Sequence, residues 1–329
     1  MEAWRSALRG DPLPWLLERD QPAVRHLALT HLLDEPPEAP AARRARAAAM
    51  RADPIAAILA AQDPEGWWVR PGARYASKYT GWFWSLIFLE QMGADPHDPR
   101  VQRACDYALT HGQAPGGGFG WTTTNSSAVH CLTGNLLRSL IAFGRLDDER
   151  VRLGIAWEAS ASTGDGHERW YPGATSGPRF ACGINGGLPC GWGAIKALRA
   201  FAAIPPRRRT QAVRRAIDLG VSFLLEHDLA SGAFPTDTTI SKNWTKLGFP
   251  SAYVADSLQG LEALVELGRG RDARVMPALD MVMAKQDAEG RWRNDHSYRG
   301  KLWADVDAPG YPSKWVTLRA CRVLRGCLG

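Results

Sequence analysis

Apolar residues along most of the chain recur at intervals of three and four, the spacing that places them on one face of a helix. The stripe Val213, Ile217, Val221 and Leu224 is a clear example. No run alternates apolar and polar residues for long enough to require a β-strand. The pattern therefore predicts an all-α protein. Its apolar-periodic segments are residues 50–62, 78–93, 98–112, 128–144, 148–160, 187–203, 209–228, 251–268, 272–286 and 312–326.

A short turn sequence recurs between successive segments. Residues 62–68 and 286–292 both fit the pattern Q-x-x-x-G-x-W, and residues 113–119 keep the same frame with Phe in place of the final Trp. Residues 164–170 and 231–234 are degenerate copies. Each copy lies between one apolar-periodic segment and the next, so each repeat corresponds to one pair of helices.

The repeat resembles that of squalene-hopene cyclases and, more widely, of the prenyltransferase and squalene-oxidase repeat superfamily. The resemblance covers residues 50–329. It implies an (α/α)6 toroid, in which inner helices line a central cavity and outer helices close the ring. It also implies that the Gln and Trp of each repeat brace a neighbouring helix. With an N-terminal helix pair at residues 4–18 and 23–33, we predict six helix pairs in a single toroid domain spanning residues 1–329.

Composition narrows the function classes. The net charge of +6 comes mostly from Arg scattered among Ala on helical stretches such as residues 41–46, which is typical of a solvated surface. No basic stripe with interleaved aromatic residues suggests nucleic-acid binding. The N-terminus lacks the pattern of a signal peptide, and no apolar run is long enough to span a membrane. Six Cys in 329 residues are too few for a disulfide scaffold, so we expect reduced thiols and a cytoplasmic protein.

Three cysteines fall near the starts of predicted inner helices. Cys131 and Cys190 each open such a helix, and Cys182 lies in the loop before the second one. Adjacent inner helices lie about 8–10 Å apart, so the three thiols can converge on one ion. Thiolates with a nitrogen or oxygen donor suit Zn²⁺. The candidate fourth ligands are His130, His167, His296 and Asp256. The alternative is that these cysteines simply pack in the core, as free Cys often does.

Two enzyme families that use the toroid suggest where carboxylates act. Protein prenyltransferase β chains hold zinc with an Asp-x-Cys at an inner helix start, and Leu188 takes the place of that Asp two residues before Cys190. Terpene cyclases of the squalene-hopene type protonate their substrate with Asp-x-Asp-Asp, and Asp305 and Asp307 keep two of its three carboxylates. A solvated turn is the alternative for that pair, because Pro-Gly follows it. Asp256, in an apolar segment, is a third candidate acid.

Aromatic residues cluster at the same predicted mouth of the ring. Trp82, Trp192, Tyr253 and Trp315 occupy the first turns of four predicted inner helices. Electron-rich ring faces can stabilise a carbocation or bind a prenyl chain, although large rings also dominate protein cores generally. Lys242 and Lys246 are candidate partners for a diphosphate, with a surface position as the alternative.

These features predict a zinc-dependent enzyme that resembles terpene cyclases and protein prenyltransferases. Its substrate would be an isoprenoid or a similarly apolar small molecule, bound in an aromatic-lined central cavity. One alternative is a thiol-activating enzyme resembling the lanthionine cyclases, which also hold zinc on an α-toroid. The other is a toroid without catalytic activity that serves as a binding or scaffold protein.

Overall fold

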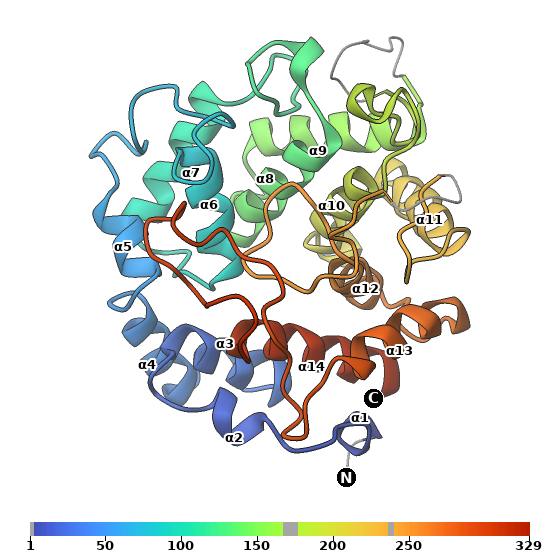
Figure 1. Ribbon diagram of the computed structural model, residues 1–329. Coiled ribbons are helices and arrows are strands. Elements are labelled where there is room, and N and C mark those ends of the chain that lie inside the picture. The colour runs from blue at the N-terminus through green and yellow to red at the C-terminus, as the bar shows by residue number, and fades with distance from the viewer. Residues whose placement is uncertain (1–2, 167–176, 236–239) are drawn as a thin grey trace.

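The computed structural model describes residues 3–166, 177–235 and 240–329. Within these ranges every regular element is a helix, as predicted, and extended backbone pairs only in isolated bridges (Figure 1). The helices are α1 (Ala3–Ser6), α2 (Leu13–Leu16), α3 (Pro22–Leu32), α4 (Pro40–Ala49), α5 (Ile55–Ala60), α6 (Trp82–Gln91), α7 (Pro99–His111), η1 (Asn125–Ser127), α8 (His130–Ala142), α9 (Glu149–Thr163), η2 (Gly183–Asn185), α10 (Gly191–Ala202), η3 (Pro206–Arg208), α11 (Gln211–Leu225), α12 (Ser257–Glu266), η4 (Ala273–Val275), α13 (Met276–Ala284) and α14 (Lys314–Leu328).

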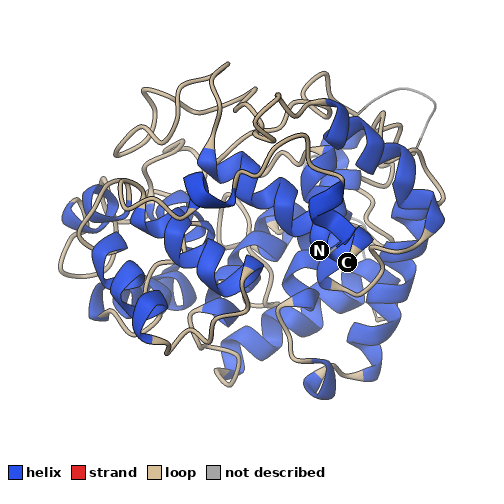
Figure 2. Ribbon diagram, turned by 90° about the horizontal axis from the view of Figure 1, so that it is seen from below, coloured by secondary structure: helices blue, strands red, loops and turns tan. Residues whose placement is uncertain are grey.

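Six helices form an inner ring. In ring order they are α3, α6, α8, α10, α12 and α14, and from α6 onward each packs against the next until α14 meets α3. At the remaining junction, Gly93 at the end of α6 lies against Leu27 of α3. The outer helices α7, α9, α11 and α13 each pack on the inner helix that precedes them, and α4 covers α3. The first and last helices, α1 and α14, lie side by side (Figures 1 and 2). The chain therefore forms the predicted all-α toroid.

The observed helices differ from the predicted ones in three places. The outer partner of α3 is α4, which lies outside every predicted segment, and not residues 4–18. Residues 4–18 form the short helices α1 and α2 rather than one helix, since Gly10, Pro12 and Pro14 interrupt the pattern. The segment 251–268 becomes helical only at Ser257, and the stretch before it is irregular after Pro250. Tyr253 therefore lies in a loop and Asp256 at a helix N-cap, which corrects the expectation that both sit within an inner helix.

The recurring turns share one geometry. The side-chain amide of Gln62 donates to the carbonyl of Arg100 at 2.9 Å, and that of Gln286 donates to the carbonyl of Ala7 at 3.2 Å. In both turns the Trp indole N–H donates over 2.7 Å to a carbonyl ten residues earlier, Trp68 to Ile58 and Trp292 to Val282. These residues therefore brace neighbouring helices. In the Phe-containing copy at residues 113–119, the side-chain amide of Gln113 likewise donates to the carbonyl of Arg150 at 2.7 Å. Trp170 of a degenerate copy lies outside the described residues.

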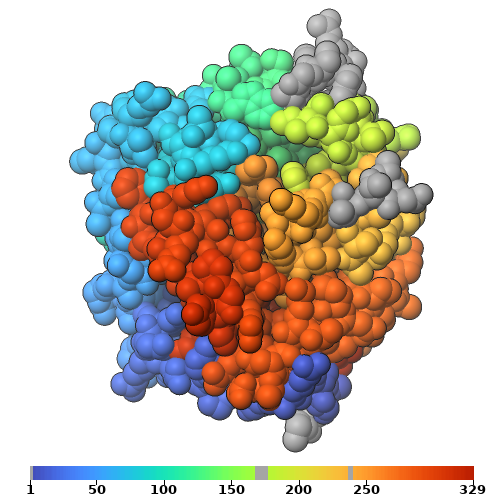
Figure 3. Space-filling model, viewed as in Figure 1, coloured from blue at the N-terminus to red at the C-terminus, as the bar shows by residue number. Residues whose placement is uncertain are grey.

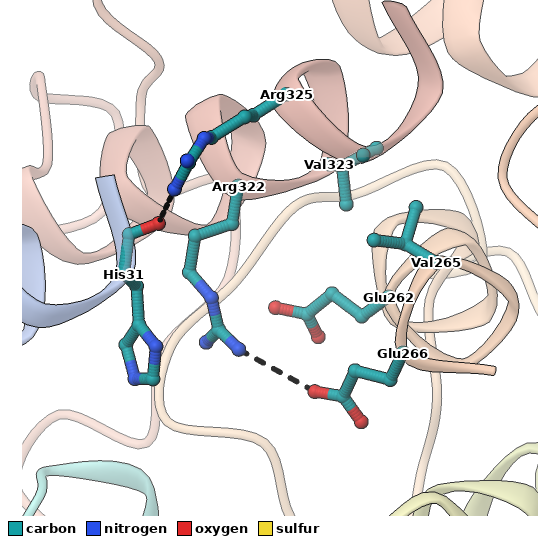
Figure 4. Close-up of a pocket in the computed structure, with 8 residues that line it drawn as sticks. His31, Glu262, Val265, Glu266, Arg322, Val323 and Arg325 are labelled. Carbon is teal, nitrogen blue, oxygen red and sulfur yellow. Dashed lines mark hydrogen bonds and ion pairs between the residues drawn. The ribbon is translucent and has the colours of Figure 1, made fainter. Parts of the chain in front are cut away.

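Charged residues fill one end of the ring interior. Arg138 of α8 pairs with Glu90 of α6 and with Glu266 of α12, which is not its neighbour in the ring. Further pairs join the carboxylates of α12 to α10 and α14 through Arg199, Arg319 and Arg322. Figure 4 shows the edge of this network, where a cavity of about 320 Å³ lies between α3, α12 and α14, with Arg322 extended toward Glu266. Arg199 lies in the last turn of α10, where the helix dipole favours positive charge.

Irregular segments cover the opposite end of the ring. Residues 248–256 enter the interior, where Gln91 of α6 and Asn135 of α8 bond the carbonyls of Ser251 and Ala252. Residues 293–313, drawn in orange to red in Figures 1 and 3, cross the same face, and the Trp303 indole donates to the carbonyl of Thr80 at 3.0 Å. No helix in the described part of the chain is long and apolar enough to cross a membrane.

Candidate functional site

A cavity of about 200 Å³ lies at the N-terminal ends of α8 and α10. Its walls come from these two helices and from the loops around them, and most of the lining is apolar. Aromatic rings and thiols are the distinctive groups. The lining residues are Tyr75, Trp121, Val129, Cys131, Leu132, Cys182, Ile184, Asn185, Cys190, Trp192, Ile240 and Tyr253.

Two glycines bring the cavity-bearing helices together. A Cβ atom at Gly134 of α8 would lie 2.4 Å from the carbonyl carbon of Lys196 on α10, and one at Gly193 would lie 3.0 Å from the Cβ of His130. Any larger residue would force the two backbones apart. Because the helices approach so closely, the first turn of α8, with Cys131, lies beside the first turn of α10, with Cys190 at its N-cap.

Four aromatic rings form a continuous wall. The Tyr75 ring centroid lies 5.6 Å from that of Tyr253 and 6.2 Å from that of Trp121, and Tyr253 meets Trp192 edge-on at 6.2 Å. The Lys78 ammonium nitrogen lies 4.3 Å from the Tyr75 centroid and 4.5 Å from the Tyr253 centroid, which is a favourable cation–π distance. Sequence reasoning missed Tyr75 and Trp121, because they lie in loops without a periodic pattern. It also missed Lys78, which stands at the start of the predicted segment 78–93 but precedes the observed helix α6.

One polar atom on this wall has no partner. The Trp192 indole nitrogen is buried, and no hydrogen-bond acceptor for it exists among the described residues. An unsatisfied buried donor costs about 1–3 kcal/mol. A ligand that brings an acceptor to the indole would remove this cost.

The three predicted cysteines all line this cavity, and their environments differ. The Cys190 thiol donates a hydrogen bond to Cys182 and, with the backbone N–H groups of Ile184 and Asn185, lowers the pKa of Cys182 to about 6. The same hydrogen bond, together with burial, raises the pKa of Cys190. Burial raises the pKa of Cys131 to about 12.

The candidate zinc ligands do not form a complete donor set in this structure. His130 uses Nδ1 in a 2.6 Å contact with Glu158 Oε1 and Nε2 in a 3.2 Å contact with the Gly177 carbonyl. Both ring nitrogens are therefore engaged away from the thiols. His296 and Asp256 do not line the cavity, and His167 lies outside the described residues. Across the described ranges, no group of three or more His, Cys, Asp and Glu side chains is arranged to hold a metal ion.

The candidate acids lie away from the cavity. Asp256 caps α12 by accepting the Gln259 N–H at 2.7 Å, and it lies 3.6 Å from Arg319. Asp305 accepts the Gly300 N–H at 2.7 Å in an exposed loop. Asp307 accepts the Ser313 hydroxyl at 2.5 Å, and burial raises its pKa. No carboxylate of the described residues lines the cavity.

Of the predicted substrate-binding residues, two line the cavity and four do not. Trp192 and Tyr253 line the cavity, as expected. Trp82 is 1 % exposed and packs against Tyr107 and the glycine at the end of α7, so it belongs to the core. Trp315 stacks on Phe249 at 4.4 Å, also in the core. The exposed residues Lys242 and Lys246 do not line the cavity.

Comparison with known proteins gives distant structural similarities. No protein-family model matches the chain, and no curated protein matches it either. Among solved structures, the chain is similar to the R337A variant of the type II terpene cyclase MstE from Scytonema, in complex with geranylgeranyl dihydroxybenzoate. The identity is 16 %, the match covers 83 % of this chain and 94 % of the cyclase, and the TM-score is 0.32. A protein from Actinoplanes is 14 % identical over 83 % of this chain and 96 % of its own, with a TM-score of 0.30. At these values the comparisons assign no activity, and the toroid follows from the helix packing itself.

Proposed function

We propose that this protein is an enzyme that takes an isoprenoid or a similarly apolar substrate into the cavity at the N-terminal ends of α8 and α10. The observation that carries the proposal is the composition of the wall, in which four aromatic rings and three thiols surround one space. Ligand sites combine a mostly apolar lining with a few placed polar groups, and the thiols and the Trp192 indole are those groups here.

The cavity also limits the kind of substrate. Its volume of about 200 Å³ is below the roughly 300–1,000 Å³ of typical ligand pockets. A compact isoprenoid, or one end of a longer chain, suits it better than a folded polycyclic precursor. The unpartnered Trp192 N–H favours a substrate with an oxygen acceptor near its apolar body. Since the candidate aspartates lie elsewhere, we propose no protonation of the substrate by a carboxylic acid.

Binding of a ten-carbon isoprenoid alcohol, geraniol, tests this function. Titration calorimetry should show saturable binding to the intact chain, and Trp192→Ala should weaken it at least tenfold. Trp67→Ala is the matched control, because Trp67 is a half-buried Trp in a surface turn outside the cavity. Equal affinity in both variants, or no binding to the unaltered protein, would contradict the proposal. A peptide thiol that bound in place of geraniol would favour the lanthionine-cyclase alternative.

A zinc site is a second proposal for the same cavity. Its support is that Cys131, Cys182 and Cys190 line one space and that Cys182 is acidic. The described side chains include no group of three donors arranged to hold a metal ion. We therefore derive no reaction step from the metal. Metal analysis of protein purified without added metal tests the proposal. Equimolar zinc that is lost in Cys190→Ser would support it, and absence of zinc would refute it. A metal-free protein that also fails to bind geraniol would favour a scaffold.

A further inference from the structure

We propose that the groove between α3 and α4 is a binding site for a small anion that carries two or more phosphoryl groups. A cavity of about 280 Å³ opens between these helices, which lie side by side in Figure 1, and Arg19, Arg25 and Arg44 line it. None of its lining residues belongs to the aromatic cavity. The inference is therefore independent of the proposed function and adds a second kind of ligand to it.

Packing between the two helices gives the groove its shape. The buried ring of His26 on α3 contacts the Ala42 carbonyl of α4 through Nδ1 at 3.0 Å, which ties the helices together. On α4 the cavity is bordered by Ala41, Ala45 and Ala48, which share one helix face because they are three and four residues apart. Their side chains end at Cβ, so a hollow remains between the helices.

The loop before α3 separates its charges. Glu18 and Asp20 both contact the ammonium group of Lys314, at 2.7 and 2.5 Å. Arg19, which stands between these two acids in the sequence, lines the cavity instead. The carboxylates nearest to Arg19 along the chain are therefore engaged by a lysine of α14, and they leave the arginine without a partner.

The positive charge around the cavity is not balanced by the protein. Among the described residues none of the three arginines forms an ion pair, and no acidic residue lines the cavity. Arg25 donates only to the Leu17 carbonyl. Because guanidinium groups do not lose their charge in proteins, three like charges border one space and repel one another. An anion with several negative charges, placed between them, removes this repulsion.

The chemistry of the lining favours phosphoryl groups on a small molecule. A guanidinium group presents paired N–H donors that match phosphate oxygens, and several such groups together hold a polyanion. The side chains of Arg19 and Arg44 make no hydrogen bond within the described part of the chain, so their donors are available. The volume of about 280 Å³ is close to the lower end of the roughly 300–1,000 Å³ range of small-molecule sites. A diphosphate group fits this description.

Titration calorimetry of the intact chain with inorganic pyrophosphate, at constant ionic strength, tests the site. Binding should be saturable with one site per chain, and Arg44→Gln should weaken it at least tenfold because one guanidinium group is lost from the ligand. Arg43→Gln is the matched control. Arg43 is also an exposed arginine of α4, but it does not line the cavity, so its removal changes the net charge equally and should leave the affinity nearly unchanged.

A second variant tests the position of the ligand without changing any charge. Ala48 is partly exposed at the edge of the groove, and Ala48→Leu should fill the cavity and abolish pyrophosphate binding while circular dichroism stays unchanged. No saturable binding at millimolar pyrophosphate, equal losses in Arg43→Gln and Arg44→Gln, or full affinity in Ala48→Leu would each overturn the site. Geraniol affinity, measured in the same variants, should not change, so failure of this site leaves the proposed function standing, and the reverse also holds.

Discussion

Glu262 of α12 and Arg319 of α14 form a two-pronged ion pair in the interior of the ring. Nε of Arg319 lies 2.8 Å from Oε1 of Glu262, Nη2 lies 2.9 Å from Oε2, and both side chains are almost fully buried. Arg199 of α10 approaches the same carboxylate at 3.3 Å. A single carboxylate thus joins three inner helices, and its removal would leave two buried guanidinium groups without their main partner.

Glu262→Gln should therefore destabilise the protein by about 3–5 kcal/mol, the usual cost of breaking a buried ion pair on one side. Urea unfolding followed by circular dichroism measures this difference. Glu226→Gln, at an exposed helix end, is the matched control and should change stability by less than about 0.5 kcal/mol. Equal effects of the two substitutions would show that the ion pair contributes little.

The same carboxylate makes stability depend on pH. Arg319 and Arg199 lower the pKa of Glu262 against the opposing effect of burial, so the folded protein keeps it ionised at pH values where the unfolded chain takes up a proton. A depressed carboxyl pKa contributes stability that is present above the unfolded value of about 4.3 and is lost as pH falls below it. Thermal unfolding from pH 7 to pH 3 should show a steep loss in the unaltered protein. The loss should be shallower in Glu262→Gln, and parallel curves would contradict this explanation.

Close packing at the recurring turn gives another prediction. Gly66 has a φ of 96°, and a Cβ atom there would lie 2.6 Å from the carbonyl oxygen of Arg103 on α7. Gly72 has a φ of 73° with nothing within 4 Å of its Cβ position. Gly72→Ala should cost about 1–2 kcal/mol for the left-handed backbone alone, and Gly66→Ala should cost a further 1–3 kcal/mol, roughly the price of overpacking. Chemical unfolding of both variants measures the difference, and similar losses would mean that the turn can move away from α7.

The sequence predicts the fold better than it predicts the site, and particular residues explain why. Gln62 and Trp68 belong to a repeat, and the brace they form is identical in kind at Gln286 and Trp292. Helix periodicity also places the ends of α8 and α10, and with them the cysteines. Periodicity does not say, however, which way the first side chain of a helix points.

Trp82 and Trp192 illustrate this limit. Both were expected to line the mouth of the ring, yet the space left by Gly112 at the end of α7 accommodates the ring of Trp82, whereas Trp192 turns into the cavity. Tyr75 and Trp121 reach the cavity from loops whose course depends on distant contacts. Glu158 is the partner of His130. In the sequence, the only indication of this role is that Glu158 is an acidic residue on an otherwise small and apolar helix face.

The contrast between these two tryptophans is itself testable by thermal and chemical unfolding. Trp82 is 1 % exposed and surrounded by Phe83, Tyr107 and the backbone of Gly112, so Trp82→Ala leaves a cavity inside the packed core. Such truncations cost about 3–5 kcal/mol. Trp192 already borders an open space, and its indole nitrogen has no partner among the described residues. Trp192→Ala should therefore cost clearly less than Trp82→Ala, because part of its contact surface is missing. The loss of an unsatisfied indole donor is common to both substitutions, since the Trp82 indole nitrogen also has no partner among the described residues. If the two variants lost equal stability, Trp192 would be a core residue, and a scaffold function would become the better explanation of the aromatic wall.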